Sequence, residues 1–432
     1  MKPSLAIFSG VLCLLLALVC ACEDTRYASS LLDTDSSGDG DPDQGSAAIT
    51  CDTVPDGDWA DAGWAACGPV ALSGQRYQSF ARLVWMGERF AAVWLENQGR
   101  LRVAVAFIDP ASLEVGEPIF LSEPTTPETA DRAPERVEAV WTGQSLAVVW
   151  STESGLWGRQ VSSDGTLRGE PQLVVSGTGE RINLKAVRAL PGGRLGVVWL
   201  DDRVAPFEYT AWFASFGFGQ EPVTSHRELG NPGEFIAIGG VSQGIADPCD
   251  CNDRRLFSLS YETWNRDEEG DTLVWVRFDQ DGEVVVEDPI HVADNVQLHF
   301  EGESVVDLPE GVAVGLWDQD EGAMVVFADA LGGTSSQSVL IPDGGGDRPS
   351  LANAPGVGWA GAVVDAVSLF EDGDGVVFFA LDGRGQPLAG PLMLPGTLGA
   401  DVDRYNIVAG GGGFGVLTEV EREVRFTFVA PR

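Results

Sequence analysis

The chain has 432 residues, of which 44% are hydrophobic, so it holds enough apolar side chains for a sizeable folded core. Its formal net charge is −38, from 65 acidic residues against 27 Lys and Arg. An acidic excess of this size opposes binding to nucleic acid phosphates, so no nucleic acid partner is expected, and it equally opposes docking of the folded domain on anionic lipid. The only lysines are Lys2 and Lys185, so almost every cation is an arginine.

Residues 1–21 have a basic start and an apolar run that is too short to span a membrane comfortably. Val19 lies three positions before Cys22, and the small residue Ala21 lies directly before it. This arrangement resembles the lipobox of bacterial lipoproteins, which implies cleavage before Cys22 and a lipid on that cysteine. By the same resemblance, Glu23 favours sorting to the outer membrane of the cell envelope, and the leaflet stays open. Ordinary secretion is the alternative.

Residues 22–50 are rich in Asp, Ser and Gly, so we expect a flexible acidic tether. Four cysteines follow the tether: Cys51, Cys67, Cys249 and Cys251. An even number of cysteines in an exported protein predicts disulfides. One bridge would close an N-terminal segment over residues 51–67, and the other would join the close pair. The connectivity stays open, and a metal site at the close pair is the alternative.

From residue 68 to residue 432 the chain repeats strands and turns with a period of roughly 50 residues. The clearest copies contain a strand, a Gly turn and a second strand that ends in Trp94, Trp150 or Trp199. Weaker copies bring the number to seven. A short fourth strand begins with an acid or Gly and a Pro, as at residues 221–223, and a Pro there indicates the edge of a sheet.

Seven repeats of this kind resemble the blades of a β-propeller. We therefore predict an all-β chain with a single β-propeller over residues 68–432, of seven four-stranded blades. The last copy has three strands, and residues 68–72 have the fourth-strand pattern, so pairing of the N- and C-terminal strands should close the ring. Six or eight blades, or a pair of β-sandwiches, are the alternatives. The repeated tryptophans should pack between blades, with sugar stacking as the alternative.

Five arginines are expected at the heads of innermost strands, near the mouth of the central channel. They are Arg76, Arg132, Arg181, Arg348 and Arg404. The first three each stand 18 positions before a second-strand tryptophan. One interpretation is clamping between blades, in which each guanidinium binds a neighbouring carboxylate. The other is a ring of arginines that binds an anionic ligand, such as a carboxylated sugar or a peptide C-terminus.

Acidic residues gather in the loops between second and third strands, among them Glu96, Glu153, Asp201 and Glu421. Solvation of an acidic protein explains them. The alternative is a calcium site, for which the candidate oxygen donors are Asp318, Asp320, Asp372 and Asp374. No other cofactor is expected.

The sequence contains no P-loop and no nucleophile elbow, and its three histidines are scattered, so we identify no catalytic residue. We predict a lipid-anchored, non-catalytic binding or scaffold module for a protein or glycan, which meets the membrane through its lipid only. The alternative is a carbohydrate-active enzyme, a glycosidase or lyase. Sialidase-type propellers use an arginine cluster, a tyrosine and carboxylates, and Arg76-Tyr77 and Arg404-Tyr405 resemble parts of such a set. The Asp-box repeat of that family is not matched.

Overall fold

The computed structural model describes residues 64–431 with short gaps, and every structural statement below concerns the described residues. The gaps are 73–77, 98–100, 125–132, 177–181, 206–207, 231–237, 243, 247–254, 265–270, 286–289, 295, 298–304, 309–310, 319–321, 330–336, 341–348, 355–358, 367–374, 383–386 and 401. The expected signal and tether lie outside the described residues. In the part that is described, no helix is both long and apolar enough to cross a membrane.

Three sheets in the first half of the chain have four strands each, and all their pairs are antiparallel. Sheet 1 contains β2 (Gln78–Trp85), β3 (Phe90–Asn97), β4 (Leu101–Ile108) and β5 (Ile119–Phe120). Sheet 2 contains β6 (Arg136–Trp141), β7 (Ser145–Thr152), β8 (Gly155–Ser162) and β9 (Leu167–Val175). Sheet 3 contains β10 (Asn183–Ala189), the 3₁₀ turn η3 (Pro191–Gly193), β11 (Leu195–Ala205), β12 (Glu208–Phe216) and β13 (Arg227–Gly230).

The second half of the chain forms four more sheets. Sheet 4 contains β14 (Ile238–Val241), β15 (Ile245–Ala246), β16 (Arg255–Trp264), β17 (Asp271–Asp279) and β18 (Ile290–Asp294). Sheet 5 contains β19 (Val296–Gln297), β20 (Val305–Leu308), β21 (Gly311–Asp318), β22 (Gly322–Asp329) and β23 (Gln337–Leu340). Sheet 6 contains β24 (Ser350–Ala354), β25 (Trp359–Ala366), β26 (Gly375–Asp382) and β27 (Pro387–Met393). Sheet 7 contains β28 (Val402–Gly410), β29 (Gly413–Val420), β30 (Glu423–Pro431) and β1 (Trp64–Ala71).

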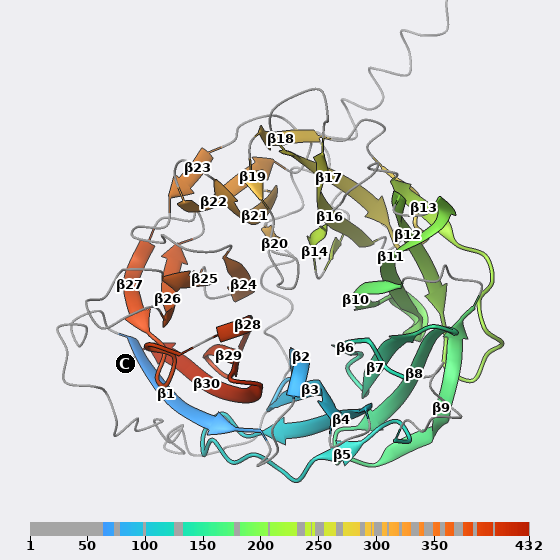
Figure 1. The fold of residues 1–432 in the computed structure, drawn as a ribbon, viewed down its shortest axis with the longest axis horizontal. Coiled ribbons are helices and arrows are strands. Elements are labelled where there is room, and N and C mark those ends of the chain that lie inside the picture. Colours follow the sequence, from blue (N-terminus) through green and yellow to red (C-terminus); the bar gives the residue numbers. More distant parts are fainter. Residues whose placement is uncertain are drawn as a thin grey trace, which may run out of the picture.

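The sheets stand side by side around a common centre, which confirms the predicted all-β propeller architecture (Figure 1). The first strand of each sheet lies nearest the centre, and the last strand lies at the rim. β3 and β7 each contain a continuous apolar run and are buried over almost their whole length, because neighbouring sheets cover both faces of each sheet.

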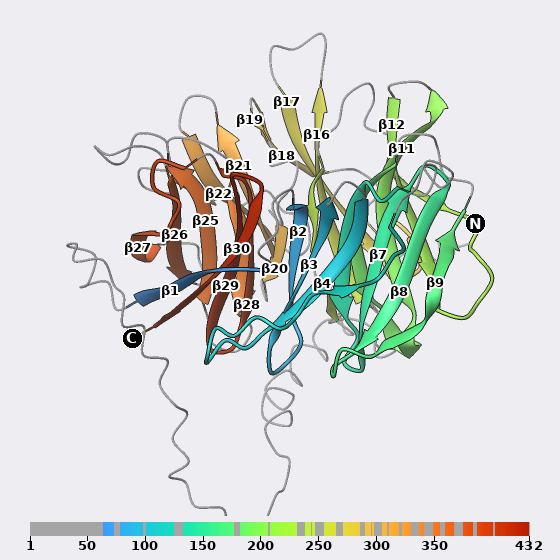
Figure 2. The same cartoon turned by 60° about the horizontal axis from the view of Figure 1, so that its bottom comes forward.

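The two ends of the described chain meet in sheet 7. β1 pairs with β30, from Trp64 opposite Pro431 to Ala71 opposite Arg425 (Figures 1 and 2). The predicted closure by N- and C-terminal strands is therefore present, and it pairs a strand edge that would otherwise be open. β1 begins at Trp64, inside the segment 51–67 that the sequence suggested as a separate unit.

The prediction of four strands in every repeat is wrong for part of the ring, because five sheets have four strands and sheets 4 and 5 have five. In sheet 4 the inner strand is split, and β14 and β15 both pair with β16. Between them Ser242 Oγ accepts the Ser258 N–H, and Gly244 adopts a φ of +85°, a left-handed conformation that favours glycine. The ladder is therefore interrupted at this point and resumes at β15.

The fourth strand expected at residues 221–223 is also wrong. Sheet 3 takes its outer strand from β13, while Val223 makes an isolated bridge with Val175 of sheet 2. The Val223 N–H donates to Val174 O at 3.0 Å, which joins two neighbouring sheets.

The repeated tryptophans form the core, as predicted. Trp94 and Trp199 are fully buried and Trp150 is nearly so, each on the second strand of its sheet. Trp150 packs with apolar residues of sheets 1 and 2, and Trp199 packs with those of sheets 2 and 3. Burying a large apolar side chain contributes about 1.5–3 kcal/mol, so this packing between sheets stabilises the ring.

Candidate functional site

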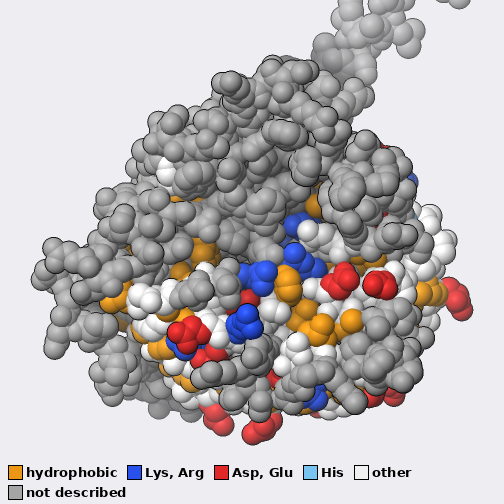
Figure 3. Space-filling model, in the orientation of Figure 1, with side chains coloured by type: hydrophobic (Ala, Val, Ile, Leu, Met, Phe, Trp, Pro, Cys, Tyr) orange, Lys and Arg blue, Asp and Glu red, His pale blue; other side chains and the backbone are white. Residues whose placement is uncertain are grey.

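Four cationic side chains gather on four neighbouring inner strands at the centre of the ring. They are Arg404 on β28, Arg82 on β2, Arg136 on β6 and Lys185 on β10, and we call them the basic cluster. Figure 3 shows Lys and Arg side chains concentrated near the middle of one face of the molecule. In a chain with a net charge of −38, such a concentration runs against the overall composition.

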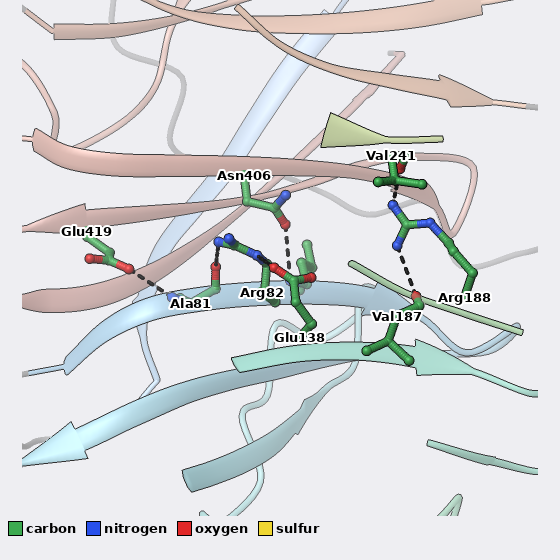
Figure 4. A network of polar contacts seen from close by, with 9 residues as sticks. Ala81, Arg82, Glu138, Val187, Arg188, Val241, Asn406 and Glu419 are labelled. Carbon is green, nitrogen blue, oxygen red and sulfur yellow. Dashed lines mark hydrogen bonds and ion pairs between the residues drawn. The ribbon is translucent and has the colours of Figure 1, made fainter. Parts of the chain in front are cut away.

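The strand register explains why these residues meet. Arg82 lies opposite Val93, and Glu138 lies opposite Val149, and each valine directly precedes a core tryptophan. Arg82 and Glu138 therefore occupy equivalent levels on adjacent inner strands. Arg82 Nε donates to Glu138 Oε1 at 2.5 Å, an ion pair between β2 and β6 (Figure 4). The two side chains are 13% and 4% exposed, so the pair is well shielded from water.

A second level of the cluster surrounds the Phe80 ring. The register of β2 shifts between Ser79 and Arg82, so Phe80 and Ala81 form a bulge, and Phe80 has a φ of +55°. The guanidinium carbons of Arg136 and Arg404 each lie 4.1 Å from the centroid of that ring. Cation–π attraction of this kind holds both arginines beside the bulge, one from each neighbouring sheet.

Glu419 on β29 joins sheet 7 to sheet 1. Its Oε1 accepts the Ala81 N–H at 2.8 Å, and its Oε2 accepts from Arg404 Nη1 at 3.3 Å (Figure 4 shows the first bond). Burial raises the pKa of this carboxyl, while the Ala81 amide, Arg404 and Arg82 oppose the rise. Burial also lowers the pKa of the Arg404 guanidinium. Glu419 opposes this decrease in pKa, and Arg136 adds to it.

Lys185 completes the basic cluster from β10. Burial lowers the pKa of its ammonium to about 7, with further lowering from Arg136 and Arg82 and opposition from Glu138. The side chain is closely surrounded by protein, yet part of its surface stays accessible to solvent. Burial and Arg82 likewise lower the pKa of Arg136 to about 10 against the influence of Glu138, Glu135 and Glu419.

Among the residues that the structure describes, the four cations of the basic cluster face two buried carboxylates, Glu138 and Glu419. A third carboxyl, Glu135, is exposed at the edge of this group, and burial and Glu153 raise its pKa while Arg136 lowers it. When cations lower one another's pKa, a nearby anion stabilises their charged forms. The arrangement is therefore suited to hold an anionic group.

Arg188, also on β10, has a different role. It is buried and donates through Nε to Ser242 O at 2.7 Å, and through Nη1 to Val187 O at 3.0 Å. Its Nη2 donates to Val241 O as well (Figure 4). This guanidinium clamps sheet 3 to sheet 4 through backbone carbonyls, so it is structural.

Among the five arginines predicted from the sequence, Arg404 lies at the expected place, near the start of an innermost strand. The other four, Arg76, Arg132, Arg181 and Arg348, lie outside the described residues. Arg404 binds Glu419 on the adjacent strand of its own sheet, so this ion pair is not the predicted clamp between blades. Its contact with the neighbouring sheet is the stacking on Phe80.

Sequence reasoning missed the other three members of the basic cluster. Arg82 stands 12 positions before Trp94, while Arg136 and Lys185 each stand 14 positions before Trp150 and Trp199. The spacing of 18 positions that selected the predicted arginines therefore does not select these three residues. One signal was available, since Lys185 is one of two lysines in the whole chain.

The acidic loops give a mixed outcome. Glu96 is buried and accepts from Arg102 Nη2 at 2.9 Å, and Asp201 is buried and accepts from Trp199 Nε1 at 2.7 Å. Both are thus engaged in structural contacts rather than solvated. The part of the chain that is described holds no group of three or more His, Cys, Asp or Glu suited to a metal ion. Of the calcium candidates, Asp320, Asp372 and Asp374 lie outside it, and Asp318 ends β21.

The predicted cysteine chemistry falls mostly outside the described residues, where Cys22, Cys51, Cys249 and Cys251 lie. Cys67 is buried in β1 and takes part in a disulfide. The pairing of the cysteines and the lipid on Cys22 stay predictions.

No family model matches the chain, and none of the curated proteins matches it. Among solved structures, a puromycin hydrolase mutant complexed with PGG is similar at 14% identity and a TM-score of 0.51, with 81% of this chain covered. The chain spans about half, 51%, of that hydrolase. An α-L-arabinanase of Penicillium chrysogenum complexed with arabinobiose has 11% identity and a TM-score of 0.47 over 74% of this chain and 99% of its own. The β-propeller domain of the Trilobed protease from Pyrococcus furiosus has 14% identity and a TM-score of 0.45, covering 83% and 94%. At these identities the similarity concerns the fold alone.

Proposed function

We propose that the propeller is a non-catalytic binding module that recognises an anionic ligand, carried by a protein or a glycan, at the basic cluster. The observation that carries this proposal is the excess of cations over carboxylates on four adjoining inner strands of a strongly acidic chain. The cost of bringing these cations together is lowered when an anion lies among them.

The chemistry of the cluster favours a carboxylate. A guanidinium offers a planar fork of donors that matches a carboxylate, whereas an ammonium acts as a point charge. Arg136 is held over Phe80 on one side, so its orientation is restricted before any ligand arrives. Restricting a side chain in advance lowers the entropy cost of binding.

We further propose that this module is displayed on the bacterial cell envelope by the lipid on Cys22, through the tether of residues 22–50. The support for this is the sequence resemblance to the lipobox of lipoproteins. The acidic surface keeps the folded domain off anionic lipid, so the lipid is the proposed membrane contact. A disulfide between Cys51 and Cys67 would hold the chain that leads into β1.

One of the two tyrosines in the hypothesis of a carbohydrate-active enzyme is buried in the core. Tyr405 is 4% exposed and lies in the core cluster with Phe378, Phe414 and Ile407, away from the guanidinium of Arg404 at the ring centre. Tyr77, the other tyrosine of that hypothesis, lies outside the described residues.

The proposal is tested by calorimetric titration at low salt with acetate, oxalate, citrate and galacturonate, using the full chain and its Arg136→Gln variant. A charge-assisted hydrogen bond contributes about 1.5–3 kcal/mol, so the variant should bind a recognised carboxylate roughly tenfold more weakly or worse. The matched control is Arg227→Gln, which removes an exposed arginine paired with Glu283 on the outer strand β13.

The expected result is saturable binding of at least one carboxylate that weakens with added salt, weakens in Arg136→Gln and is unchanged in Arg227→Gln. Absence of binding to every carboxylate, or equal binding by both variants, would overturn the proposal. Conversion of the titrant during the experiment would instead favour the enzyme alternative.

A further inference from the structure

Two tryptophans occupy the same position at the ends of adjacent inner strands. Trp85 ends β2 and lies opposite Phe90 at the start of β3, and Trp141 ends β6 and lies opposite Leu146 near the start of β7. The strands β2 and β6 are neighbours around the centre of the ring (Figure 1). Arg136 of the basic cluster is the first residue of β6, so Trp141 lies at the opposite end of that strand.

The fold does not require a large side chain at this position. In sheets 3 and 7 the equivalent residues are Ala189, opposite Leu195, and Ala409, opposite Phe414. Ala189 packs against the core between sheets 2 and 3, as Trp141 packs against the core between sheets 1 and 2. Since alanine is sufficient in two sheets, the tryptophans add apolar surface that packing between sheets does not demand.

The chain makes room for the indole of Trp85. A Cβ at Gly410, the last residue of β28, would lie 2.3 Å from Cδ2 of that indole, so glycine is needed beside the ring. On β3 the Phe90 ring contacts the same indole, with centroids 4.8 Å apart. Two neighbouring sheets therefore fix the position of the Trp85 ring.

Both indoles are partly exposed, unlike the tryptophans of the second strands, and both have a free donor. Among the described residues, Nε1 of Trp85 and Nε1 of Trp141 have no hydrogen-bond acceptor, and neither atom is buried. Each tryptophan is followed two positions later by an exposed glycine, Gly87 or Gly143, where an added Cβ would meet no atom within 4 Å. The turns beside the two indoles are therefore open to solvent.

A partly buried indole with a free N–H suits a ligand that is apolar on one face and has acceptors at its edge. A pyranose ring with equatorial hydroxyls is such a ligand, because its axial C–H groups form a slightly positive face that matches the negative face of the indole. Its oxygens can accept from Nε1. The adjacent turns carry the acid Glu88, the base Arg89 and the neutral Gln144, so the local charge is balanced and favours a neutral ligand.

We propose that Trp85 and Trp141 are stacking platforms that bind a neutral oligosaccharide. They lie at the other end of the inner strands from Arg136, and their ligand carries no charge, so this inference goes beyond the proposed function and does not rest on it. Two platforms on adjacent strands suit a ligand of several linked rings, because binding of the first ring raises the effective concentration of the next.

The experiment is calorimetric titration of the full chain with cellohexaose and with chitohexaose, two neutral oligosaccharides whose rings have equatorial hydroxyls and flat apolar faces. The variants are Trp85→Ala and Trp141→Ala, which introduce the residue that sheets 3 and 7 have at this position, and urea unfolding verifies that each variant folds. The matched control is Trp157→Ala, which removes a partly buried tryptophan on β8 whose Nε1 donates to Ser154 Oγ at 3.2 Å.

We expect saturable binding of at least one of the two oligosaccharides, and added salt should not weaken it. Each platform variant should bind about fivefold more weakly or worse, and Trp157→Ala should bind like the parent chain. Footprinting with hydroxyl radicals adds a measurement on the unaltered chain, in which the bound sugar should slow the oxidation of Trp85 and Trp141 but not that of Trp157.

Three results would overturn the proposal. The first is the absence of binding to both oligosaccharides. The second is an equal loss of affinity in Trp157→Ala and in the two platform variants. The third is binding that leaves the oxidation rates of Trp85 and Trp141 unchanged. None of these results affects the binding of carboxylates at the basic cluster, so the two proposals fail independently.

Discussion

The ion pair between Arg82 and Glu138 allows a direct test of how the basic cluster is built. Glu138→Gln removes the negative partner and leaves Arg82 beside Arg136 and Lys185. Arg82→Met removes the positive partner and leaves a carboxylate in a site where it is 4% exposed. The double variant removes both charges and keeps side chains of similar length.

The magnitude follows from the shielding of the pair. Breaking a buried ion pair by removing one partner costs about 3–5 kcal/mol, because the remaining charge is left uncompensated. Replacing both partners is often close to neutral. Since Arg82 keeps 13% of its surface in water, we expect the lower end, about 3 kcal/mol, for Glu138→Gln. Arg82→Met should cost less, because Arg136 and Lys185 still face the Glu138 carboxylate. The double variant should lose less than the sum of the two by about 1.5–3 kcal/mol.

Equilibrium unfolding in urea at pH 7, followed by tryptophan fluorescence, measures the free energy of unfolding of the four proteins. The interaction energy is the departure of the double variant from additivity. Additivity within about 0.5 kcal/mol would refute the view that this pair is a shielded link between sheets 1 and 2.

Three further predictions concern other contacts. Asn406→Ala removes the Oδ1 that accepts the buried Leu83 N–H at 3.0 Å, so the free energy of unfolding should fall by about 1–3 kcal/mol in urea titration. Gly413→Ala places a Cβ 2.3 Å from the backbone oxygen of Val429, and overpacking should lower the midpoint of urea unfolding by the equivalent of about 1–3 kcal/mol. Between pH 7 and about 10.4 the unfolded chain holds more protons on Lys185 than the folded chain, so Lys185 should make the free energy of unfolding increase with pH. The free energy of unfolding of Lys185→Met should lack this contribution to the increase.

Much of the architecture could be predicted from local patterns. The second strands β3 and β7 are covered on both faces, so their apolar character up to Trp94 and Trp150 is continuous and visible in the sequence, although both strands extend beyond the tryptophan. The position of β1 could also be predicted from the sequence. Residues 68–72 had no partner strand in their own repeat, and the last repeat lacked its outer strand. β1 and β30 supply that pair.

The details that failed depend on contacts between distant segments. The split inner strand of sheet 4 involves Ser258, which bonds Ser242, and Asp307, whose Oδ2 accepts the Gly244 N–H at 2.8 Å. No local sequence pattern predicts that Ser258 and Asp307 contact this segment. The edge strand expected at residues 221–223 has the right composition for a strand, but Val223 bridges Val175 on the neighbouring sheet.

The sequence predicted a group of cations at the heads of the innermost strands, but it identified only one of the four residues of the basic cluster. The expectation that cations head the innermost strands holds for Arg404. Arg136 occupies the equivalent level two sheets further on, since Arg404 lies opposite Glu419 and Arg136 opposite Ser151. Lys185 joins them through a bulge, and bulge positions follow from packing between sheets rather than from spacing along the chain.

The central claim is that the inner strands β28, β2, β6 and β10 hold an anion among the cations of the basic cluster. The most direct measurement is a crystal structure of the protein grown with bromide, in which anomalous scattering locates bound halide without reference to any ligand hypothesis. The account predicts a bromide peak within contact distance of Arg136 and Lys185, which Arg136→Gln loses while its fold is kept. Bromide bound elsewhere on the molecule, with none at the basic cluster, would contradict it.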